Sequence, residues 1–461
     1  MPHVDFTLYV ITDGQRPVAE YQVPPNAQKL VLLADRPFCE NHPPKKRPSE
    51  SDIEAEFVPP LRLLLKGIIK PASNISRYGQ VIYDLWRYFQ CYHWSQTWES
   101  QPARAAFFKE VKELYVEGTE DFLPGEIPGK YEMVTAMDKM SCYLQSLSAP
   151  VPKTDIVHST NAGFIGGLPG IIAKYAHGTP FLLTEHGVSM RENSIRISHQ
   201  PFSSFFKVFL FRFMKFISQL NYDLADWIST TSQFNRRWEI HLGADPKKIE
   251  VVYNGVSPEF FLPKPKPPQT ANRPTVIGSA NIVLLKDIET LVRAAAVTRE
   301  TIPNVYYLIY GSHSVDPLYA EKCRKLVNEL NLDGTLEFGD FNRQPKEIYN
   351  AGDVTVISSI SESCPYALLE SMACARPVVS TDVGDVKKIL EGCGIVVPPR
   401  NHEALGHAVS ELLKNDELRL HLGNKARELI VAKYTSTMTM NAIWKLYLRL
   451  AGVKHPVRVL S

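Results

Sequence analysis

The chain has 461 residues, of which 44% are hydrophobic and 22% are charged, and its formal net charge at pH 7 is only +2. This length exceeds what one hydrophobic core usually serves, so we expect a globular protein of two domains. The near-zero charge balance gives no indication of a nucleic-acid partner. The basic run at 45–47 lies among prolines and serines and is better explained as a solvated loop.

The seven cysteines are scattered, with no CxxC pair and no metal-ligand spacing. This pattern favours a reducing compartment and predicts no metal site. The first residues lack the charged-then-apolar pattern of a signal peptide. No uninterrupted apolar run approaches the roughly 20 residues that a membrane span needs. We therefore expect a cytoplasmic protein.

In the N-terminal half, short apolar runs predict strands at 5–11, 29–33, 155–159, 181–184, 227–230 and 250–252. Residues from about 55 to 150 have a helical pattern. Six phenylalanines recur at helical spacing through 201–220, interleaved with Lys207, Arg212 and Lys215. Such a segment can lie on a membrane surface or bury its aromatic stripe inside the domain, and we favour burial.

The segment 262–268 is a stiff, proline-rich linker. After it, apolar runs predict strands at 275–280, 305–310, 336–338, 354–358, 377–380 and 394–397. Helical patterns between them cover 287–301, 317–330, 345–350 and 365–374, and a last one covers 438–450. Alternation of strands and helices predicts a parallel, doubly wound sheet, so the fold class is α/β.

These patterns divide the chain into four parts. The expected parts are an N-terminal Rossmann-like domain (1–262), a linker (263–270), a C-terminal Rossmann-like domain (271–435) and a C-terminal helix (436–461) that crosses back to the N-terminal domain.

The strongest local signal runs from Ser361 to Cys374, after the expected strand 354–358. A small polar loop leads to Pro365, which suits the first turn of a helix. Ligands of open α/β sheets bind at such carboxyl strand ends, and a helix N-terminus offers N–H groups to a diphosphate. Glu362 and Glu370 can face one crevice, and their carboxylates can accept hydrogen bonds from vicinal hydroxyls. The alternative is a pair of surface glutamates that flank an ordinary helix.

Glu362-x7-Glu370, Met372-Ala373 and the run 376–379 resemble retaining glycosyltransferase family 4, which has the GT-B fold. The resemblance is strongest to its PelF-like exopolysaccharide glycosyltransferases, and it covers nearly the whole chain. Further matching stretches are 183–187, 191–192, 254–256, 286–288, 316–319, 358–362 and 380–384. The resemblance implies two Rossmann-like domains that face a central cleft.

The resemblance also implies a hexosyltransferase that moves a sugar from a nucleotide-diphosphate donor, UDP-glucose or similar, to a glycan acceptor with retention. Glu370 would hold the ribose, Glu362 a donor-sugar hydroxyl, and Lys286 would neutralise the diphosphate. His186 would contact the transferred sugar near the reaction centre. Lys286 as a surface lysine and His186 as a structural histidine are the alternatives.

The remaining expected donor-binding positions are Asn281, Gly311, Ser363, Cys364 and Pro365. His158, Arg191 and Glu192 are expected on the acceptor side or in the cleft, although Arg191 and Glu192 can simply pair with each other. The resemblance implies no metal and no cofactor, since the nucleotide-sugar is a substrate. The expected partners are the nucleotide-sugar, the glycan and a membrane-bound synthase complex at the inner face of the membrane.

The chain departs from the family pattern at four places. The family's first strand and Gly-rich loop are expected to be missing, Asn281 replaces an arginine, Ser363 replaces a glycine, and Ala375 replaces another glycine. Asparagine has neither the charge nor the bidentate fork of arginine. These departures keep a second hypothesis open, a catalytically impaired GT-B protein that binds a nucleotide, a sugar or a partner. A sugar-nucleotide epimerase of the same fold is a third.

Overall fold

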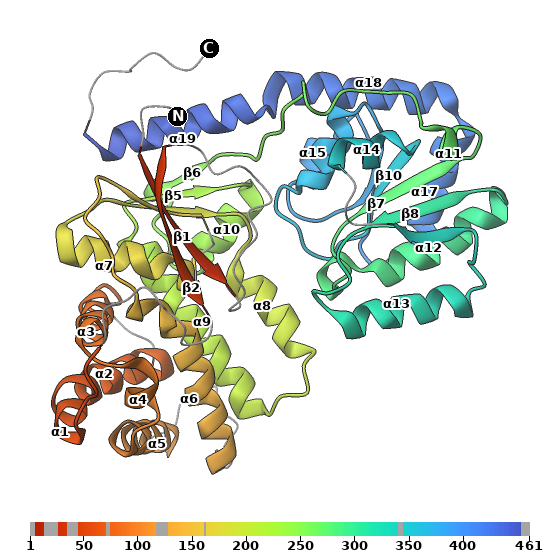
Figure 1. Cartoon of the computed structure of the whole chain (residues 1–461). Helices are drawn as coiled ribbons and strands as arrows, with labels where there is room; N and C mark the ends of the chain where they lie inside the picture. The colour runs from red at the N-terminus through yellow and green to blue at the C-terminus, as the bar shows by residue number, and fades with distance from the viewer. Residues whose placement is uncertain are drawn as a thin grey trace. The chain divides into compact units, whose positions relative to one another are not determined.

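The computed structural model describes residues 5–12, 26–34, 45–70, 74–116, 128–160, 163–339 and 344–452. The chain divides into two compact units (Figure 1). Unit 1 comprises Met1–Ile228 and Glu239–Ile249, and unit 2 comprises Ser229–Trp238 and Glu250–Ser461. The expected boundaries at 262/263, 270/271 and 435/436 stay predictions.

The strands of the N-terminal half form two sheets. One is the parallel pair β1 (Phe6–Thr12) and β2 (Ala27–Ala34). The other has the order β3-β4-β5-β6, with the bounds Val157–Ser159, Phe181–Glu185, Trp227–Thr230 and Ile249–Val251. Every residue of β4 is buried, which explains why its first three residues, 181–183, are all apolar rather than alternating with polar ones.

Helices fill most of the rest of unit 1 (Figure 1). They are α1 (Glu50–Asp52), α2 (Val58–Ile69), α3 (Tyr78–Cys91), α4 (Trp94–Trp98), α5 (Gln101–Val116), α6 (Lys130–Leu144), α7 (Leu168–His177), α8 (Ser189–Ser198) and α9 (Ser204–Leu224). The helical interpretation of the aromatic-rich stretch from about 55 to 150 is confirmed for its described residues.

Helix α9 carries the phenylalanine stripe, and Ser203 caps its first turn by accepting a hydrogen bond from the Phe206 N–H. The expectation of burial is confirmed, since five of the six phenylalanines within the helix are buried and the sixth, Phe211, is partly buried. The five buried ones are Phe205, Phe206, Phe209, Phe213 and Phe216. Only Phe202, which precedes the helix, is 42% exposed. Across the described ranges, none of the helices combines the length and apolar character that crossing a membrane requires.

Unit 2 is built on a six-stranded parallel sheet with the order β12-β11-β10-β7-β8-β9. Its strands are β7 (Thr275–Ser279), β8 (Tyr306–Tyr310), β9 (Leu336–Gly339), β10 (Val354–Ile357), β11 (Val378–Thr381) and β12 (Ile395–Val397). All six expected strands of this half are confirmed to within one or two residues.

The helices after β6 are α11 (Pro268–Ala271), α12 (Ile288–Thr301), α13 (Pro317–Glu329), α14 (Pro345–Asn350), α15 (Tyr366–Ala373), α16 (Val386–Ile389), α17 (His402–Lys414), α18 (Asp416–Lys433) and α19 (Ser436–Leu450). Helix α10 (Gln233–His241) lies earlier in the chain and spans the division between the units. The sequence analysis missed α16, α17 and α18. The short helix α11 overlaps the end of the expected stiff linker, so Pro268 begins a helix rather than only extending the chain.

The sheet of unit 2 is covered on both faces (Figure 1). Neighbouring strand residues alternate between two cores: Val276 packs with α12, α13 and α17, whereas Ile277 packs with α14, α15 and α18. The α/β fold class with Rossmann-like domains is therefore confirmed. Ligand-binding loops are left at the carboxyl ends of the strands.

The Phe213→Ala variant tests the aromatic core of unit 1. Because the Phe213 side chain is fully buried, its removal leaves a cavity and is expected to lower the free energy of unfolding by about 3–5 kcal/mol. Urea denaturation measures this change. Phe202→Ala is the matched control. A decrease in its free energy of unfolding as large as that in Phe213→Ala would contradict the assignment of the core.

Candidate functional site

An ion pair lies at the carboxyl end of the unit 2 sheet. Lys286 ends a short turn after β7, and Glu362 lies in the loop after β10. The Lys286 Nζ is 2.5 Å from the Glu362 Oε1, and the Ser359 hydroxyl donates to the same oxygen at 2.6 Å. The Ser358 hydroxyl donates to the Lys286 carbonyl oxygen at 2.7 Å. Adjacent strand ends thus bring an amine and a carboxylate together.

Glu370 lies in α15, on the same loop–helix segment as Glu362. The hydroxyl of the buried Tyr349 donates to the Glu370 Oε2 at 2.7 Å. Burial raises the pKa of Glu370, and the hydrogen bond from Tyr349 partly offsets that rise. Glu370 is therefore held in one orientation by a neighbour that the sequence analysis did not single out.

The loop between Glu362 and α15 is held in place by contacts with two other segments of unit 2. The Ser363 hydroxyl is buried and lies 2.7 Å from the Thr231 hydroxyl and 2.8 Å from the Ser232 hydroxyl. A Cβ at Gly384, whose φ is +60°, would lie 2.6 Å from the Glu362 carbonyl oxygen. Ser363, which stands where the resembled family has a glycine, thus links this loop to Thr231 and Ser232 through its hydroxyl group.

Cys364 and Pro365 follow in the same loop. Burial raises the pKa of the Cys364 thiol to about 12, so this sulfur is a neutral packing group. The Cys364 carbonyl oxygen accepts a hydrogen bond from the Asn254 side chain at 2.8 Å. Pro365 has an extended backbone and precedes α15, so the expectation that it stands in the first turn is wrong by one residue.

Asp385 is a second residue that the sequence analysis missed, although it directly follows a quoted motif. Its buried carboxylate accepts from the backbone N–H groups of Gln233 and Phe234, both at 2.9 Å, and from the Tyr253 hydroxyl at 2.7 Å. Its own N–H donates to the Ser363 carbonyl oxygen at 3.0 Å. Asp385 therefore caps α10 and fixes the loop that carries Glu362. The Gly384-Asp385 turn after a strand was the available signal.

Asn281 and Gly311 lie at the ends of β7 and β8. The Asn281 Oδ1 accepts a hydrogen bond from the Ser312 N–H at 3.3 Å. A Cβ at Gly311 would lie 1.8 Å from the Ala280 carbonyl oxygen, so only glycine allows the two loops to approach this closely. Asn281 connects two loops here and brings no positive charge.

Ala375, where the family has a glycine, adopts a left-handed backbone with φ +52°. This conformation favours glycine, so the alanine makes the turn after α15 strained. The turn after α15 is nevertheless formed with alanine at this position.

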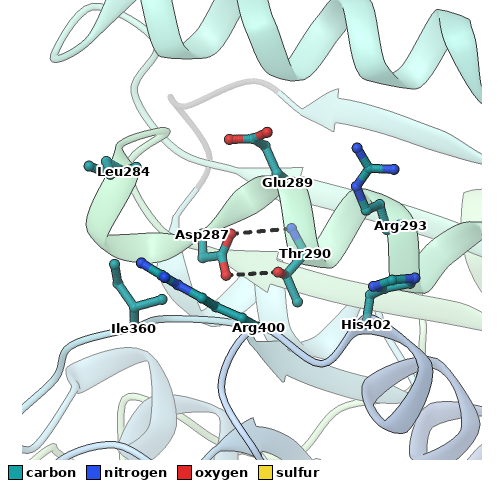
Figure 2. Close-up of a pocket in the computed structure, with 8 residues that line it drawn as sticks. All are labelled: Leu284, Asp287, Glu289, Thr290, Arg293, Ile360, Arg400 and His402. Atoms are coloured by element: carbon teal, nitrogen blue, oxygen red, sulfur yellow. Dashed lines mark hydrogen bonds between the residues drawn. The ribbon is translucent and has the colours of Figure 1, made fainter. Parts of the chain in front are cut away.

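A cavity of about 420 Å³ lies beside the turn that carries Lys286 (Figure 2). Asp287, which has φ +45°, caps α12 there through hydrogen bonds from the N–H and the hydroxyl of Thr290. The cavity is lined by Leu284, Asp287, Glu289, Thr290, Arg293, Ile360, Arg400 and His402. The lining does not include Lys286 or Glu362, but Leu284, Asp287 and Ile360 lie within two positions of them in the sequence, so the cavity adjoins the ion pair.

In unit 1, two histidines lie at the carboxyl ends of β3 and β4. The His158 Nε2 is 2.7 Å from the Thr184 hydroxyl. Burial, with a smaller effect from His186, lowers the pKa of His158 to about 4, so His158 is neutral at physiological pH. His186 is exposed and directly follows β4.

Arg191 and Glu192 lie in the first turn of α8. Burial lowers the pKa of Arg191, and the charge of Glu192 partly offsets this shift. A Cβ at Gly187 would lie 2.2 Å from the Glu192 Oε1, so the Glu192 carboxylate covers the loop that follows His186. Both residues therefore border the same loop as His186.

Glu185 is a third residue to which the sequence analysis assigned no role, although it lies in the matching stretch 183–187. It is fully buried, and its carboxyl group accepts hydrogen bonds from Tyr222, Gly163 and Ser189. Burial raises its pKa to about 7. A polar residue at the end of an apolar strand was the signal, but only the fold shows that the side chain points inward.

Two family models match the chain. Residues 1–247 match the model described as "Domain of unknown function (DUF3492)", and residues 263–429 match "Glycosyl transferases group 1". The D-inositol 3-phosphate glycosyltransferase of Corynebacterium glutamicum is 26% identical over 292 residues, which is 59% of this chain and 67% of that protein. The alpha-maltose-1-phosphate synthase of Mycolicibacterium smegmatis is 25% identical over 61% of this chain and 75% of that protein.

A further relative, the D-inositol 3-phosphate glycosyltransferase of Mycobacteroides abscessus, is 29% identical over 40% of this chain and 43% of that protein. The match thus spans about two thirds of the length of the Corynebacterium glutamicum protein and less than half of the length of the Mycobacteroides abscessus protein.

Among solved structures, sucrose-phosphate synthase from Thermosynechococcus elongatus superposes with a TM-score of 0.55 at 21% identity, over 72% of this chain and 83% of that one. Anabaena HepE in complex with UDP-glucose gives 0.54 at 16% identity, over 63% of this chain and 78% of that one. At these identities the likeness shows the GT-B fold. The chain belongs to the family described as "Domain of unknown function (DUF3492)", joined in its C-terminal part to a domain of the glycosyl transferases group 1.

Proposed function

We propose that the chain is a retaining glycosyltransferase that transfers a sugar from UDP-glucose, or a similar nucleotide-diphosphate donor, to a glycan acceptor. One observation carries the proposal: the Lys286–Glu362 pair lies at the carboxyl ends of a parallel sheet, next to the helix that holds Glu370. This is where open α/β sheets bind ligands. The match of residues 263–429 to the glycosyl transferases group 1 supports it.

Each charged group of the donor site has a separate proposed role. The Lys286 ammonium neutralises the diphosphate as the bond to the sugar breaks. Glu362 accepts a hydrogen bond from a donor-sugar hydroxyl, and Glu370, oriented by Tyr349, accepts from the ribose. The acceptor hydroxyl oxygen bonds to the anomeric carbon as the bond from that carbon to the diphosphate breaks. The departing diphosphate oxygen takes the electrons of the broken bond and accepts the proton of the acceptor hydroxyl.

The other expected site residues belong to the same proposal. Asn281, Gly311, Ser363, Cys364 and Pro365 shape the donor loops through the contacts described above. In unit 1, His186 contacts the transferred sugar, and His158, Arg191 and Glu192 serve the acceptor side. The reaction needs no cofactor in this proposal.

The finer parts of the proposal rest on the resemblance to the PelF-like enzymes. They are membership of family 4, a role in exopolysaccharide synthesis, and a cytoplasmic location at a membrane-bound synthase complex.

A second candidate is a GT-B protein that binds a nucleotide-sugar without turnover. The observation that favours it is the loss of positive charge at Asn281, whose side chain connects two loops. Lys286 is then the one cation that the proposal assigns to the diphosphate. UDP binding without donor hydrolysis or transfer would identify this candidate.

The Glu370→Ala variant tests the nucleotide site. UDP at 100 times its Kd is expected to stabilise the unmodified chain by about 2.7 kcal/mol, seen as a rise in Tm. Without the carboxylate that binds the ribose, this rise should largely disappear. The control is Glu391→Ala, which removes an exposed glutamate of the same unit and should keep the full rise. An undiminished rise in Glu370→Ala would remove that residue from the site.

The Glu362→Gln variant separates binding from turnover. The Glu362 carboxylate pairs with Lys286 and so competes with a diphosphate for its charge. We expect UDP to bind about fivefold more tightly to the variant, as for the loss of a modest ion pair, and sugar transfer to fall. Calorimetry measures the Kd. Glu321→Gln, which removes the exposed carboxylate that pairs with Arg324, should leave the Kd unchanged. Weaker UDP binding in Glu362→Gln would refute the proposal that the Glu362 carboxylate competes with the diphosphate for Lys286.

The anomeric outcome tests the reaction itself. With UDP-glucose and an acceptor glycan, NMR of the first product formed is expected to show the α-linkage of the donor. Turnover should persist in EDTA, because the Lys286 ammonium is proposed to balance the diphosphate charge. Lys286→Ala should lose most of the turnover. A β-linked product, or activity that EDTA abolishes, would contradict the proposed mechanism.

A further inference from the structure

The carboxyl group of Glu185 joins three segments of unit 1 around the end of β4. The Tyr222 hydroxyl, from α9, donates to its Oε2 at 2.5 Å. The Gly163 N–H donates to Oε1 at 3.2 Å, and the N–H of Ser189, the first residue of α8, approaches the same oxygen at 3.4 Å. Both Glu185 and Tyr222 are fully buried. Each of the two carboxyl oxygens therefore has a donor.

Glu185 and His186 occupy opposite sides of the chain at the strand end. Side chains alternate along a strand, so His186 is expected on the side of Thr184, the residue that contacts His158. The pKa of His158 responds to His186, which agrees with this placement. Glu185 points the other way, toward Tyr222. Its effect on His186 must therefore pass through the backbone.

The hydrogen bond to Ser189 closes a short loop. Only His186, Gly187 and Val188 separate Glu185 from Ser189, so the side chain of the last strand residue holds the first residue of α8. The loop that carries His186 is thus anchored at both ends by one carboxyl group. A group placed this way restricts where the His186 backbone can lie.

The packing around the carboxyl group leaves little freedom. A Cβ at Gly163 would lie 2.8 Å from the Tyr222 ring and 3.4 Å from the Glu185 Oε1. Glycine at this position therefore lets the backbone N–H reach the carboxyl oxygen. A buried polar group with its partners in place is costly to disturb.

We propose that Glu185 is a positioning residue for sugar transfer, whose carboxyl group holds the His186 loop in place through Tyr222, Gly163 and Ser189. This inference rests on the proposed function, in which His186 contacts the transferred sugar. Glu185 is a positioning residue in this proposal because its buried carboxyl group contacts Tyr222, Gly163 and Ser189 and acts on His186 through the backbone.

The kinetic test compares Glu185→Ala with Glu185→Gln in the full chain. A displaced His186 misaligns the reacting groups, so Glu185→Ala is expected to lower kcat for UDP-glucose turnover by about 10- to 100-fold. The Kd for UDP should stay the same, because the proposed donor residues belong to unit 2. Glu185→Gln keeps an acceptor for the two N–H groups and a donor for the Tyr222 oxygen, and should restore most of the rate.

Hydrogen exchange gives a readout that does not depend on activity. In Glu185→Ala, the amides of 186–189 should exchange at least about tenfold faster, as expected for a locally opened loop, while peptides of unit 2 keep their rates. Glu185→Gln should exchange like the unmodified chain. The matched control is Glu110→Gln, which changes another buried glutamate of unit 1, paired with Arg62 and Lys66. It should change neither the rate nor the exchange of 186–189.

The pH dependence of stability tests whether the carboxyl group stays buried. Its folded pKa, about 7, lies above the ordinary 4.5, so its stabilisation is fully present below pH 4.5 and is lost as the pH rises through 7. The Tm difference between the unmodified chain and Glu185→Gln should follow this course. The titratable or charged groups nearest this cluster include Tyr222 on α9, Arg191 and Glu192 on α8, His158 on β3, His186 after β4, and Glu239, whose charge acts on Tyr222.

Unchanged kcat and unchanged exchange in Glu185→Ala would overturn the inference. A decrease in kcat in Glu185→Gln as large as that in Glu185→Ala would also overturn the inference, because the amide preserves the hydrogen bonds. If the unmodified chain transfers no sugar, the proposed function fails, and the exchange of 186–189 still decides whether Glu185 holds the loop.

Discussion

The pairing of Lys286 with Glu362 is the interaction on which the proposed donor site depends. Parallel strands end at one edge of a sheet, so the loops after β7 and β10 meet there, and the two charges lie 2.5 Å apart. Each charge partly neutralises the other until a ligand offers both of them a partner. A nucleotide-sugar does so, because its diphosphate suits the ammonium and its hydroxyls suit the carboxylate.

Carboxyl groups away from that pair hold the loops that the chemistry would use. Asp385 anchors the Glu362 loop to the start of α10, and Glu185 anchors the His186 loop to α8 and α9. In both places a buried acid accepts backbone N–H groups and a tyrosine hydroxyl. Loops at strand ends lack the ladder hydrogen bonds of the sheet, so side-chain acceptors have to order them.

Periodicity predicted the regular elements well, because burial imposes it directly. A strand covered on both faces is a short apolar run, and a helix with one buried face repeats its apolar residues every three or four positions. The strands of unit 2 and the buried stripe of α9 follow from this rule. Helices α17 and α18 were missed because their apolar positions are interspersed with many charges, although asparagine N-caps, Asn401 and Asn415, precede them.

The family motifs in the sequence selected Lys286, Glu362 and Glu370, since they record residue types at the ends of recognisable strands and helices. Only the tertiary structure showed that Lys286 and Glu362 form an ion pair, and that Glu185 points inward. The physical reason is that a polar residue beside an apolar strand gives the same sequence pattern whether its side chain faces solvent or a buried partner. That choice is made by segments distant in sequence, such as α9, which brings the hydroxyl of Tyr222 to Glu185.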